Sequence, residues 1–326
     1  MIDPLTHATA AVIETPYRPG DLAADPALRK VYALTQDGVL TIIDGSANAV
    51  ENTIALPPGS YSEAHPFAVN PNNHLVYIPN PGNQSVAVVD GRTDAVLTEI
   101  PIGATPYSAA VDPSTNLVYI GTDDGITIIN SNSNEVVFPT LLPGTDLRNV
   151  LADRCTCRIA AADENDGTLY TLDSRTGAMI DTLQIGAAGF ALDAGLGLLF
   201  VINQARDGVE ALDICTLQAA GLLPLSTDAG TILSGIAVDS RNHLVYVADA
   251  GLDQTYVIDG GMNQELAVVP AVGGEGSSLA GVATLACPGP CAKCCGGSGG
   301  SGATGATGAI IYPQRLQPIY IAKNRG

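Results

Sequence analysis

The chain repeats one unit of roughly 40–46 residues, and this internal repeat constrains the fold more than any single residue does. We place six copies at residues 19–59, 60–103, 104–144, 145–186, 187–230 and 231–273. A unit of this size cannot bury its apolar faces alone, so neighbouring units must stack to form a continuous core. The repeat therefore predicts an architecture of stacked units, and the strands within each unit identify which one.

The second unit shows four short runs rich in β-branched residues, each closed by turn residues. The runs are Phe67-Ala-Val-Asn-Pro, Asn73-His-Leu-Val-Tyr-Ile, Ser85-Val-Ala-Val-Val-Asp-Gly and Ala95-Val-Leu-Thr-Glu-Ile-Pro-Ile-Gly103. This pattern is typical of strands. In other units Asp-Gly pairs such as Asp37-Gly38 and Asp124-Gly125 separate the second and third runs, as in tight hairpins. Four antiparallel strands per repeat predict an all-β fold, a β-propeller.

The ends of the chain predict how the ring closes. Residues 8–15 match an outer strand, whereas residues 279–285 match an inner one. Residues 309–312 and 318–322 match second and third strands, so a last blade would combine strands from both termini and leave no open edge. We therefore predict seven four-stranded blades over residues 1–286, interrupted by a linker at 287–308 and completed by residues 309–326. Six blades with a free C-terminal arm that completes a neighbouring subunit is the alternative.

Three second strands carry a recurring motif, Leu75-Val-Tyr-Ile78, Leu117-Val-Tyr-Ile120 and Leu244-Val-Tyr-Val247. At these positions the chain resembles the YVTN family of β-propeller repeats, over roughly residues 19–273. The resemblance implies a propeller fold and a place outside the cytoplasm, on a cell surface or in an envelope layer. Many members of that family have no assigned reaction. The fourth unit departs from the pattern, with Arg154-Cys-Thr-Cys-Arg158 in place of a plain turn.

Charge and hydropathy exclude several classes of partner. The chain has 33 acidic residues against 14 Lys and Arg, a net charge of −19. Such a field repels nucleic acid and anionic membranes. No apolar run approaches the roughly 20 residues that span a bilayer, so we expect no membrane insertion. No basic and then apolar leader follows Met1.

Four of the seven cysteines lie within the segment Cys287-Pro-Gly-Pro-Cys-Ala-Lys-Cys-Cys-Gly296. A site for zinc or another thiophilic metal would use Cys287, Cys291, Cys294 and Cys295, but their tight spacing does not match paired zinc knuckles. Cys291 and Cys294 form a CxxC pair, but a thioredoxin-like redox role would need a βαβ unit, which the sequence does not show. We therefore favour disulfides within or between chains. Unpaired thiols on a flexible loop remain the last possibility.

The other three cysteines, Cys155, Cys157 and Cys215, fall at predicted corners that share one face of the disc with the insertion. All seven cysteines are thus disulfide or cross-link candidates, and their odd number leaves one for another chain if all oxidise. Acidic hairpins such as Asp123-Asp124 would lie on the other face. A disc with two unlike faces favours head-to-tail stacking into a filament.

Glycine recurs at every third position from 296 to 308, in Gly-Gly-Ser and Gly-Ala-Thr triplets. This period resembles a short collagen-like segment, and a flexible tether is the alternative. Gly-Ala-Thr triplets beside clustered cysteines also resemble surface and spore-layer proteins of Gram-positive spore formers. The resemblance implies a subunit made without a leader and then cross-linked.

Catalytic signals are weak. His74 and His243 occupy the same turn of two repeats, His7 lies near the chain start, and His65 lies where it could face the central channel. The sequence has no HExxH motif, nucleophile elbow or phosphate-binding loop. Asp163, Glu164 and Asp166 could bind calcium, although their spacing is not that of an EF-hand.

We therefore predict a non-enzymatic, cofactor-free structural protein that polymerises with itself on a cell or spore surface or outside the cell. The alternatives are a propeller that binds zinc, another metal or a ligand, and an unidentified propeller enzyme.

Overall fold

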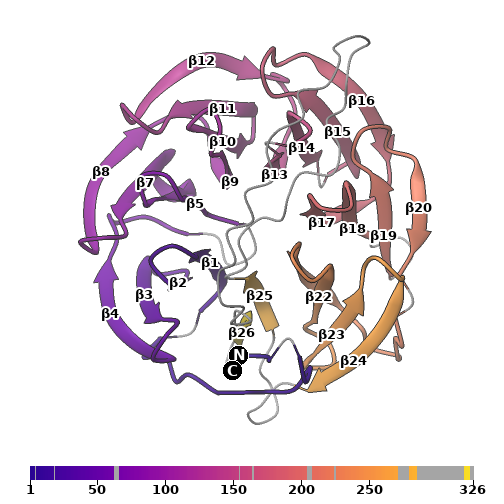
Figure 1. Cartoon of the computed structure of the whole chain (residues 1–326). Helices are drawn as coiled ribbons and strands as arrows, with labels where there is room; N and C mark the ends of the chain where they lie inside the picture. Colours follow the sequence, from indigo (N-terminus) through magenta and orange to yellow (C-terminus); the bar gives the residue numbers. More distant parts are fainter. Residues whose placement is uncertain are drawn as a thin grey trace, which may run out of the picture.

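The structure is a computed structural model that describes residues 1–3, 5–17, 19–61, 66–153, 155–163, 165–203, 208–223, 225–270, 279–284 and 319–323. Six four-stranded antiparallel sheets stand around a central axis like blades, and a two-stranded sheet lies between the sixth and the first (Figure 1). Within each sheet, strands that are consecutive in the sequence pair with each other. Each blade is therefore built from β-branched runs that short turns connect. The prediction of an all-β propeller is confirmed.

Blade 1 comprises β1 (Asp21–Asp25), β2 (Lys30–Leu34), β3 (Val39–Asp44) and β4 (Ala49–Ala55). Blade 2 comprises β5 (Ala68–Asn70), β6 (Leu75–Asn80), β7 (Ser85–Asp90) and β8 (Ala95–Pro101), with the 3-10 turn η1 (Pro81–Asn83) between β6 and β7. Blade 3 comprises β9 (Pro106–Asp112), β10 (Leu117–Thr122), β11 (Gly125–Asn130) and β12 (Glu135–Leu141).

Blade 4 comprises β13 (Leu147–Asp153), β14 (Arg158–Asp163), β15 (Thr168–Asp173) and β16 (Met179–Gln184). Blade 5 comprises β17 (Ala187–Asp193), β18 (Leu198–Asn203), β19 (Gly208–Asp213) and β20 (Ala219–Leu222). Blade 6 comprises β21 (Leu233–Asp239), β22 (Leu244–Asp249), β23 (Gln254–Asp259) and β24 (Gln264–Pro270). The remaining sheet pairs β25 (Leu279–Thr284) with β26 (Ile319–Lys323), and β25 packs between β21 and β1.

The prediction of seven four-stranded blades is wrong, because the described residues form six such blades and one sheet of two strands. Residues 8–15 form no outer strand. Their segment folds back on itself instead: Asp3 N–H donates to Ala8 O, Ala10 N–H to Met1 O, and one isolated bridge joins Ile2 to Thr9. These bonds occupy backbone groups that a ladder would need. Residues 309–312 lie outside the described residues.

The C-terminal strand also takes a different place from the predicted one. Residues 318–322 were expected as a third strand, but β26 pairs directly with the inner strand β25, with Val282 opposite Ile321. The N-terminal segment holds this part of the ring with side chains. Ile2 is buried in the apolar cluster of blade 6, and Met1 and Ile13 pack against that of blade 1. The ring is therefore completed by the two-stranded sheet between blades 6 and 1, together with side chains of the N-terminal segment.

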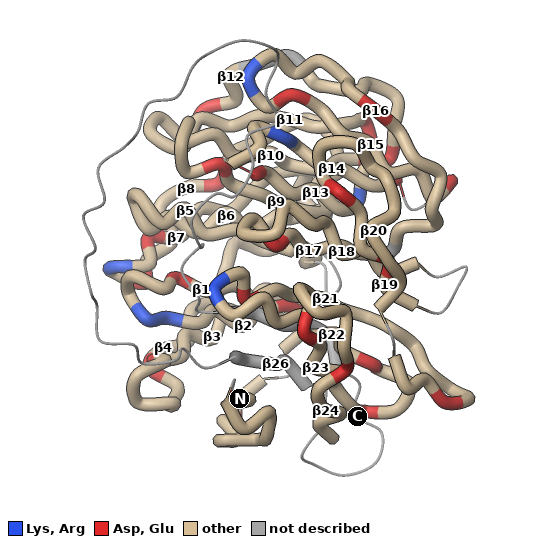
Figure 2. Tube along the Cα trace, turned by 45° about the vertical axis from the view of Figure 1, so that its right-hand side comes forward, with Lys and Arg blue, Asp and Glu red and all other residues tan. Residues whose placement is uncertain are grey.

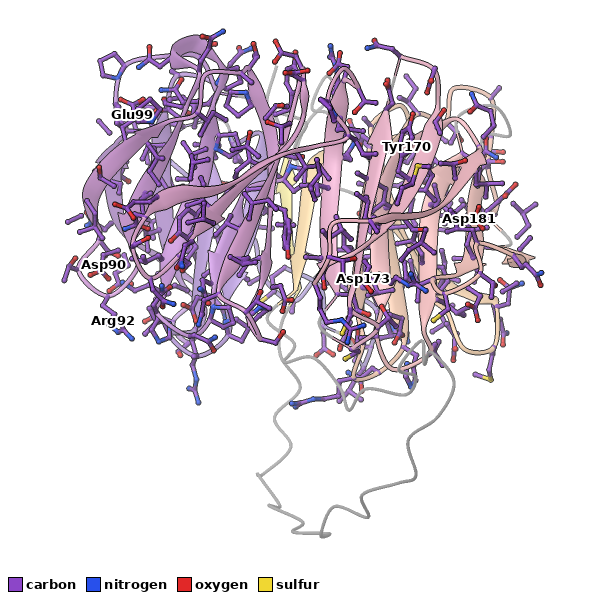
Figure 3. All side chains as sticks on the ribbon, turned by 90° about the horizontal axis from the view of Figure 1, so that it is seen from above. Asp90, Arg92, Glu99, Tyr170, Asp173 and Asp181 are labelled. Atoms are coloured by element: carbon purple, nitrogen blue, oxygen red, sulfur yellow. The ribbon has the colours of Figure 1, made fainter. Side chains whose placement is uncertain are left out.

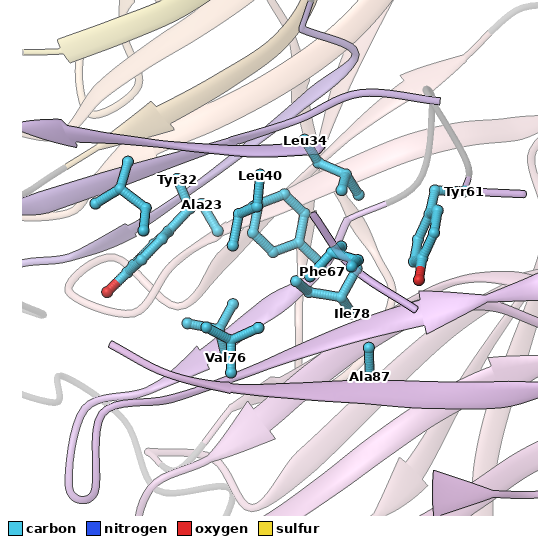
Figure 4. Close-up of a cluster of buried hydrophobic side chains, with 12 residues drawn as sticks. Ala23, Tyr32, Leu34, Leu40, Tyr61, Phe67, Val76, Ile78 and Ala87 are labelled. Atoms are coloured by element: carbon cyan, nitrogen blue, oxygen red, sulfur yellow. The ribbon is translucent and has the colours of Figure 1, made fainter. Parts of the chain in front are cut away.

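Apolar side chains between neighbouring blades form the core. Between blades 1 and 2, Tyr32, Leu40, Phe67 and Ile78 belong to one buried cluster (Figure 4). The tyrosine of the recurring motif reaches the next blade, at the turn between its third and fourth strands. That turn has a small residue where the tyrosine ring ends. Tyr77 Oη donates to Ser131 O at 3.4 Å, and this pattern recurs around the ring.

The described pairs of motif residue and following turn residue are Tyr32 with Gly91, Tyr77 with Ser131, Tyr119 with Ser174, Ala160 with Ile214, and Phe200 with Gly260. In the fourth pair the small residue is on the second strand and the large one is in the turn. The combined side-chain volume of the pair is therefore similar to that of the others. Tyr246, whose neighbour is the two-stranded sheet, has a buried hydroxyl without a hydrogen-bond partner.

Two faces of the disc follow from the antiparallel order. The turns after first and third strands lie on one face, which we call the turn face. The hairpins between second and third strands lie on the other, the hairpin face, with the connections between blades. Among the described residues, no helix is long and apolar enough to cross a membrane.

Candidate functional site

Every cysteine that the structure describes lies on the turn face. Cys155 and Cys157 occupy the turn between β13 and β14, and Cys215 the turn between β19 and β20 of the next blade. Cys155 is buried, Cys215 is half-buried, and both are disulfide-bonded. Cys157 is a free, half-buried thiol at a positive φ of 54°. Disulfide bonds between two copies of the chain stay a prediction.

Several predicted site residues lie outside the described residues, namely Cys287, Cys291, Cys294, Cys295, His65 and Glu164. The glycine-rich segment lies outside them too. Of the predicted calcium ligands, Asp163 accepts the N–H groups of Asp146 and Asn165, and Asp166 accepts that of Thr168. These oxygens therefore order local turns. Among the described residues, no group of His, Cys, Asp and Glu side chains could hold a metal ion.

The two repeat histidines join neighbouring blades on the turn face. His74 Nδ1 lies 2.6 Å from Asp25 Oδ2, and His243 Nδ1 lies 2.8 Å from Asp193 Oδ2. Each aspartate is completely buried at the end of the preceding blade's inner strand and also accepts backbone N–H groups of its own turn. These contacts are structural: they satisfy buried carboxylates. His7 lies in the N-terminal segment at a positive φ, and its Nδ1 is buried without a hydrogen-bond partner.

Charge is distributed unequally between the two faces. Six of the seven Lys and Arg side chains that the structure describes lie at the turn face: Arg29, Lys30, Arg92, Arg158, Arg175 and Arg241. The hairpins and connections on the opposite face carry Asp37, Asp123, Asp124, Asp146, Asp166, Asp228 and Asp253. Acidic segments recur around the whole disc, whereas basic ones are few (Figure 2). The hairpin face is therefore the more acidic of the two.

Arg148, the one described basic side chain on the hairpin face, lies near the start of the inner strand β13. It is the extra residue of a β-bulge in β13, and Tyr107 is the extra residue of the corresponding bulge in β9. The Arg148 guanidinium carbon lies 4.6 Å from the centre of the Tyr107 ring, and its Nη2 lies 3.1 Å from Asp146 Oδ2. Bulges re-aim side chains, so the bulges of β9 and β13 bring an aromatic ring and an ion pair together at the hairpin-face end of two neighbouring inner strands.

Sequence reasoning missed this arrangement of Tyr107, Asp146 and Arg148. No local sequence signal marks it, because Tyr107 and Arg148 are extra residues only in the register that their strands make with β10 and β14. Burial raises the pKa of Tyr107, with the Asp146 carboxylate adding to the effect. The phenol therefore stays protonated near neutral pH and can donate a hydrogen bond.

Asp21 is a buried carboxyl at the same end of the inner strand of blade 1. It accepts the backbone N–H groups of Leu22 and of Phe67 in blade 2, but its Oδ2 has no hydrogen-bond partner. Burial raises the pKa of Asp21 to about 7, outweighing the two N–H groups. Asp21 therefore changes its charge near neutral pH at the contact between blades 1 and 2.

These observations define an all-β propeller protein of six four-stranded blades, with unlike faces. No protein-family model and no curated protein matches the chain, so membership of the YVTN family stays a prediction. Kuenenia stuttgartiensis hydrazine synthase is similar in structure, with a TM-score of 0.63 and 15% identity over 84% of this chain and 92% of that one. The Cps50 (Swd1) beta-propeller domain of Myceliophteria thermophila has a TM-score of 0.68 and 13% identity over 83% and 90%. At such identities the likeness establishes the fold alone.

Proposed function

We propose that this protein is a non-enzymatic structural subunit that assembles with itself, its discs stacking head to tail through their unlike faces. The observation that carries the proposal is the unequal placement of the basic side chains: six lie at the turn face, which also carries aspartates such as Asp44 and Asp90, and one lies at the hairpin face. A turn face that holds Arg29, Arg92 and Arg241 can meet the acidic hairpin face of the next disc. Such a contact is heterologous, so it continues as a filament unless it closes.

Disulfide chemistry supports the same function. Cys155 and Cys215 are disulfide-bonded on the turn face, beside the free thiol of Cys157. Oxidation of cysteines on a stacking face makes a contact between copies covalent. Disulfides persist in oxidising surroundings, so the proposed location is outside the cytoplasm, on a cell or spore surface. The segment with Cys287, Cys291, Cys294 and Cys295, collagen-like in its glycine period, is the proposed arm between neighbours.

The test measures the size of the native protein with and without reductant. Non-reducing gels, sedimentation velocity and negative-stain microscopy report that size. We expect ladders or fibres that shorten on reduction. A variant with Cys287, Cys291, Cys294 and Cys295 replaced by serine should lose the covalent ladder. Cys157→Ser, which removes a thiol that forms no bond, is the matched control and should keep it. A protein that stays monomeric under all these conditions would refute the proposed function.

A further inference from the structure

Each outer strand contains a β-bulge at the same position of its register. In blade 2, Val88 pairs with Thr98 and Val89 pairs with Val96, so Leu97 is extra. The corresponding extra residues around the disc are Glu51, Leu97, Val137, Ile180, Ala220 and Leu266. A bulge that recurs in six strands is a feature of the repeat, and it places one additional side chain on the rim.

Three neighbouring blades present apolar side chains at this position. In blades 2, 3 and 4 both the bulge residue and the residue before it are exposed and apolar, and we call this set the rim arc. Its members are Val96, Leu97, Val136, Val137, Met179 and Ile180, with Leu97 51% and Met179 57% exposed. The rim between blades 2 and 4 faces the reader in Figure 3. Blades 1 and 5 interrupt the pattern with Glu51 and Ala220.

The bulges decide what kind of partner can bind the rim arc. A bulged edge strand is poorly suited to pairing with an added strand, so the partner must pack side chains against the rim. None of the six outer strands contains Lys or Arg, whereas Glu99, Glu135 and Asp181 lie on those of the arc. Anionic lipid and nucleic acid are therefore unfavourable partners.

Charges along the turn-face border of the arc favour a second copy of this chain. Arg92 lies at the end of blade 2, Glu135 begins the outer strand of blade 3, and Arg175 lies at the end of blade 4. All three are exposed, and Arg175 makes a 3.4 Å contact with Asp173 of its own turn. The signs of these three charges alternate from blade to blade. A second copy that meets the rim displaced by one blade can therefore place one of its arginines opposite Glu135 of the first.

We propose that the rim arc is a side-to-side contact with a second copy of this chain. The inference rests on the proposed self-association and adds a lateral contact to the stacking of discs. Filaments that also associate at their rims give a layer or a bundle. The apolar centre supplies the hydrophobic contribution, and the alternating border sets the relative position of the two copies.

The test uses the full chain with Leu97, Val137 and Ile180 all replaced by Glu. Leu222→Glu, Leu266→Glu and Val268→Glu together form the matched control, because they add the same charge to the rim outside the arc, at similarly exposed positions. Sedimentation velocity over a concentration series in reductant measures the non-covalent contact. We expect the arc variant to associate about tenfold more weakly or worse, since charges would be buried in the contact, and the control to associate as the parent does. Thermal unfolding checks that both variants are folded.

Charge exchange provides the second measurement. Glu135→Arg should weaken association, and Arg92→Glu with Arg175→Glu in the same chain should restore it. If the folded arc variant still forms lateral contacts in micrographs, the rim inference is overturned while stacking and its cysteine dependence stand. If the parent protein never associates in either redox state, the proposed function and the inference both fail.

Discussion

The hydroxyl of Tyr32 lies directly against Gly91 of the next blade. A methyl group built on Gly91 would meet Tyr32 Oη at 2.3 Å and His74 O at 3.0 Å. Tyr32 is fully buried, and its hydroxyl has no hydrogen-bond partner. The tyrosine of one blade therefore requires a residue without a side chain in the turn of the following blade.

Gly91→Ala should destabilise the protein by about 1–3 kcal/mol, because the added methyl group overpacks a rigid contact. Chemical denaturation measures the loss. Tyr32→Phe removes the hydroxyl and should relieve part of it in the double variant. Gly189→Ala is the control, since its nearest contact would be Ile202 Cδ1 at 3.8 Å. Equal losses at Gly91 and Gly189 would contradict the explanation.

The fourth blade inverts this size relationship. Ala160 replaces the tyrosine, and the following turn has Ile214, which is 1% exposed in the same apolar cluster. Ile214→Gly should cost about 2–5 kcal/mol because it leaves a cavity and adds a flexible residue. Ala160→Tyr in the same chain should recover part of that loss. A double variant whose loss equals the sum of the single losses would show that the two positions are not coupled.

The two histidine–aspartate pairs should differ in strength. His74 has 13% of its side chain exposed and His243 39%, although both sit at positive φ and contact a completely buried aspartate. His74→Asn should cost about 1–3 kcal/mol, because Asp25 loses a partner in a buried site, and His243→Asn should cost less, because water can replace the ring. Asparagine tolerates positive φ and occupies the equivalent turn position at Asn116. Unfolding free energies measured side by side decide the order, and a larger loss at His243 would refute it.

Asp21 should make stability depend on pH. Its pKa is about 7 in the folded protein against 3.8 in the reference state, so the folded state holds the proton more tightly. Its contribution to stability is full below pH 3.8 and is lost as the pH rises to about 7, up to about 4 kcal/mol. Asp21→Asn should therefore be more stable than the parent at pH 8 and similar to it near pH 4.

Asp44→Asn is the control for this pH series. The N–H groups of Ser46 and Ala47 lower the pKa of Asp44, so its contribution has the opposite sign: it is present above the unfolded pKa and is lost as the pH falls. Denaturation curves from pH 4 to 8 compare the three proteins. A parent-to-variant difference for Asp21→Asn that does not change with pH would rule out titration of this carboxyl.

The repeating strands were predictable because their signals are local. Runs such as Leu75–Asn80 and Leu117–Thr122 are β-branched and bounded by turn residues, and Gly38 and Gly125 adopt the positive φ that Asp-Gly hairpins require. The placement of Cys155, Cys157 and Cys215 on one face followed from strand order alone.

Other features depend on the tertiary structure. The bulges at Leu97 and Arg148 come from register between strands, which a single sequence does not specify. The raised pKa of Asp21 comes from burial between two blades. The failure of residues 8–15 to form a strand comes from the turns that the N-terminal segment makes with itself.

The all-β repeat, the propeller and its turn chemistry can be predicted from the sequence alone, since they depend on period, β-branched runs and glycine at fixed offsets. The number of four-stranded blades, the contact of Tyr32 with Gly91, and the exposure of Leu97 and Val137 on the rim become known only from the three-dimensional fold. Ring closure and burial depend on contacts between residues far apart in the chain, and no local pattern encodes the free energies of those contacts.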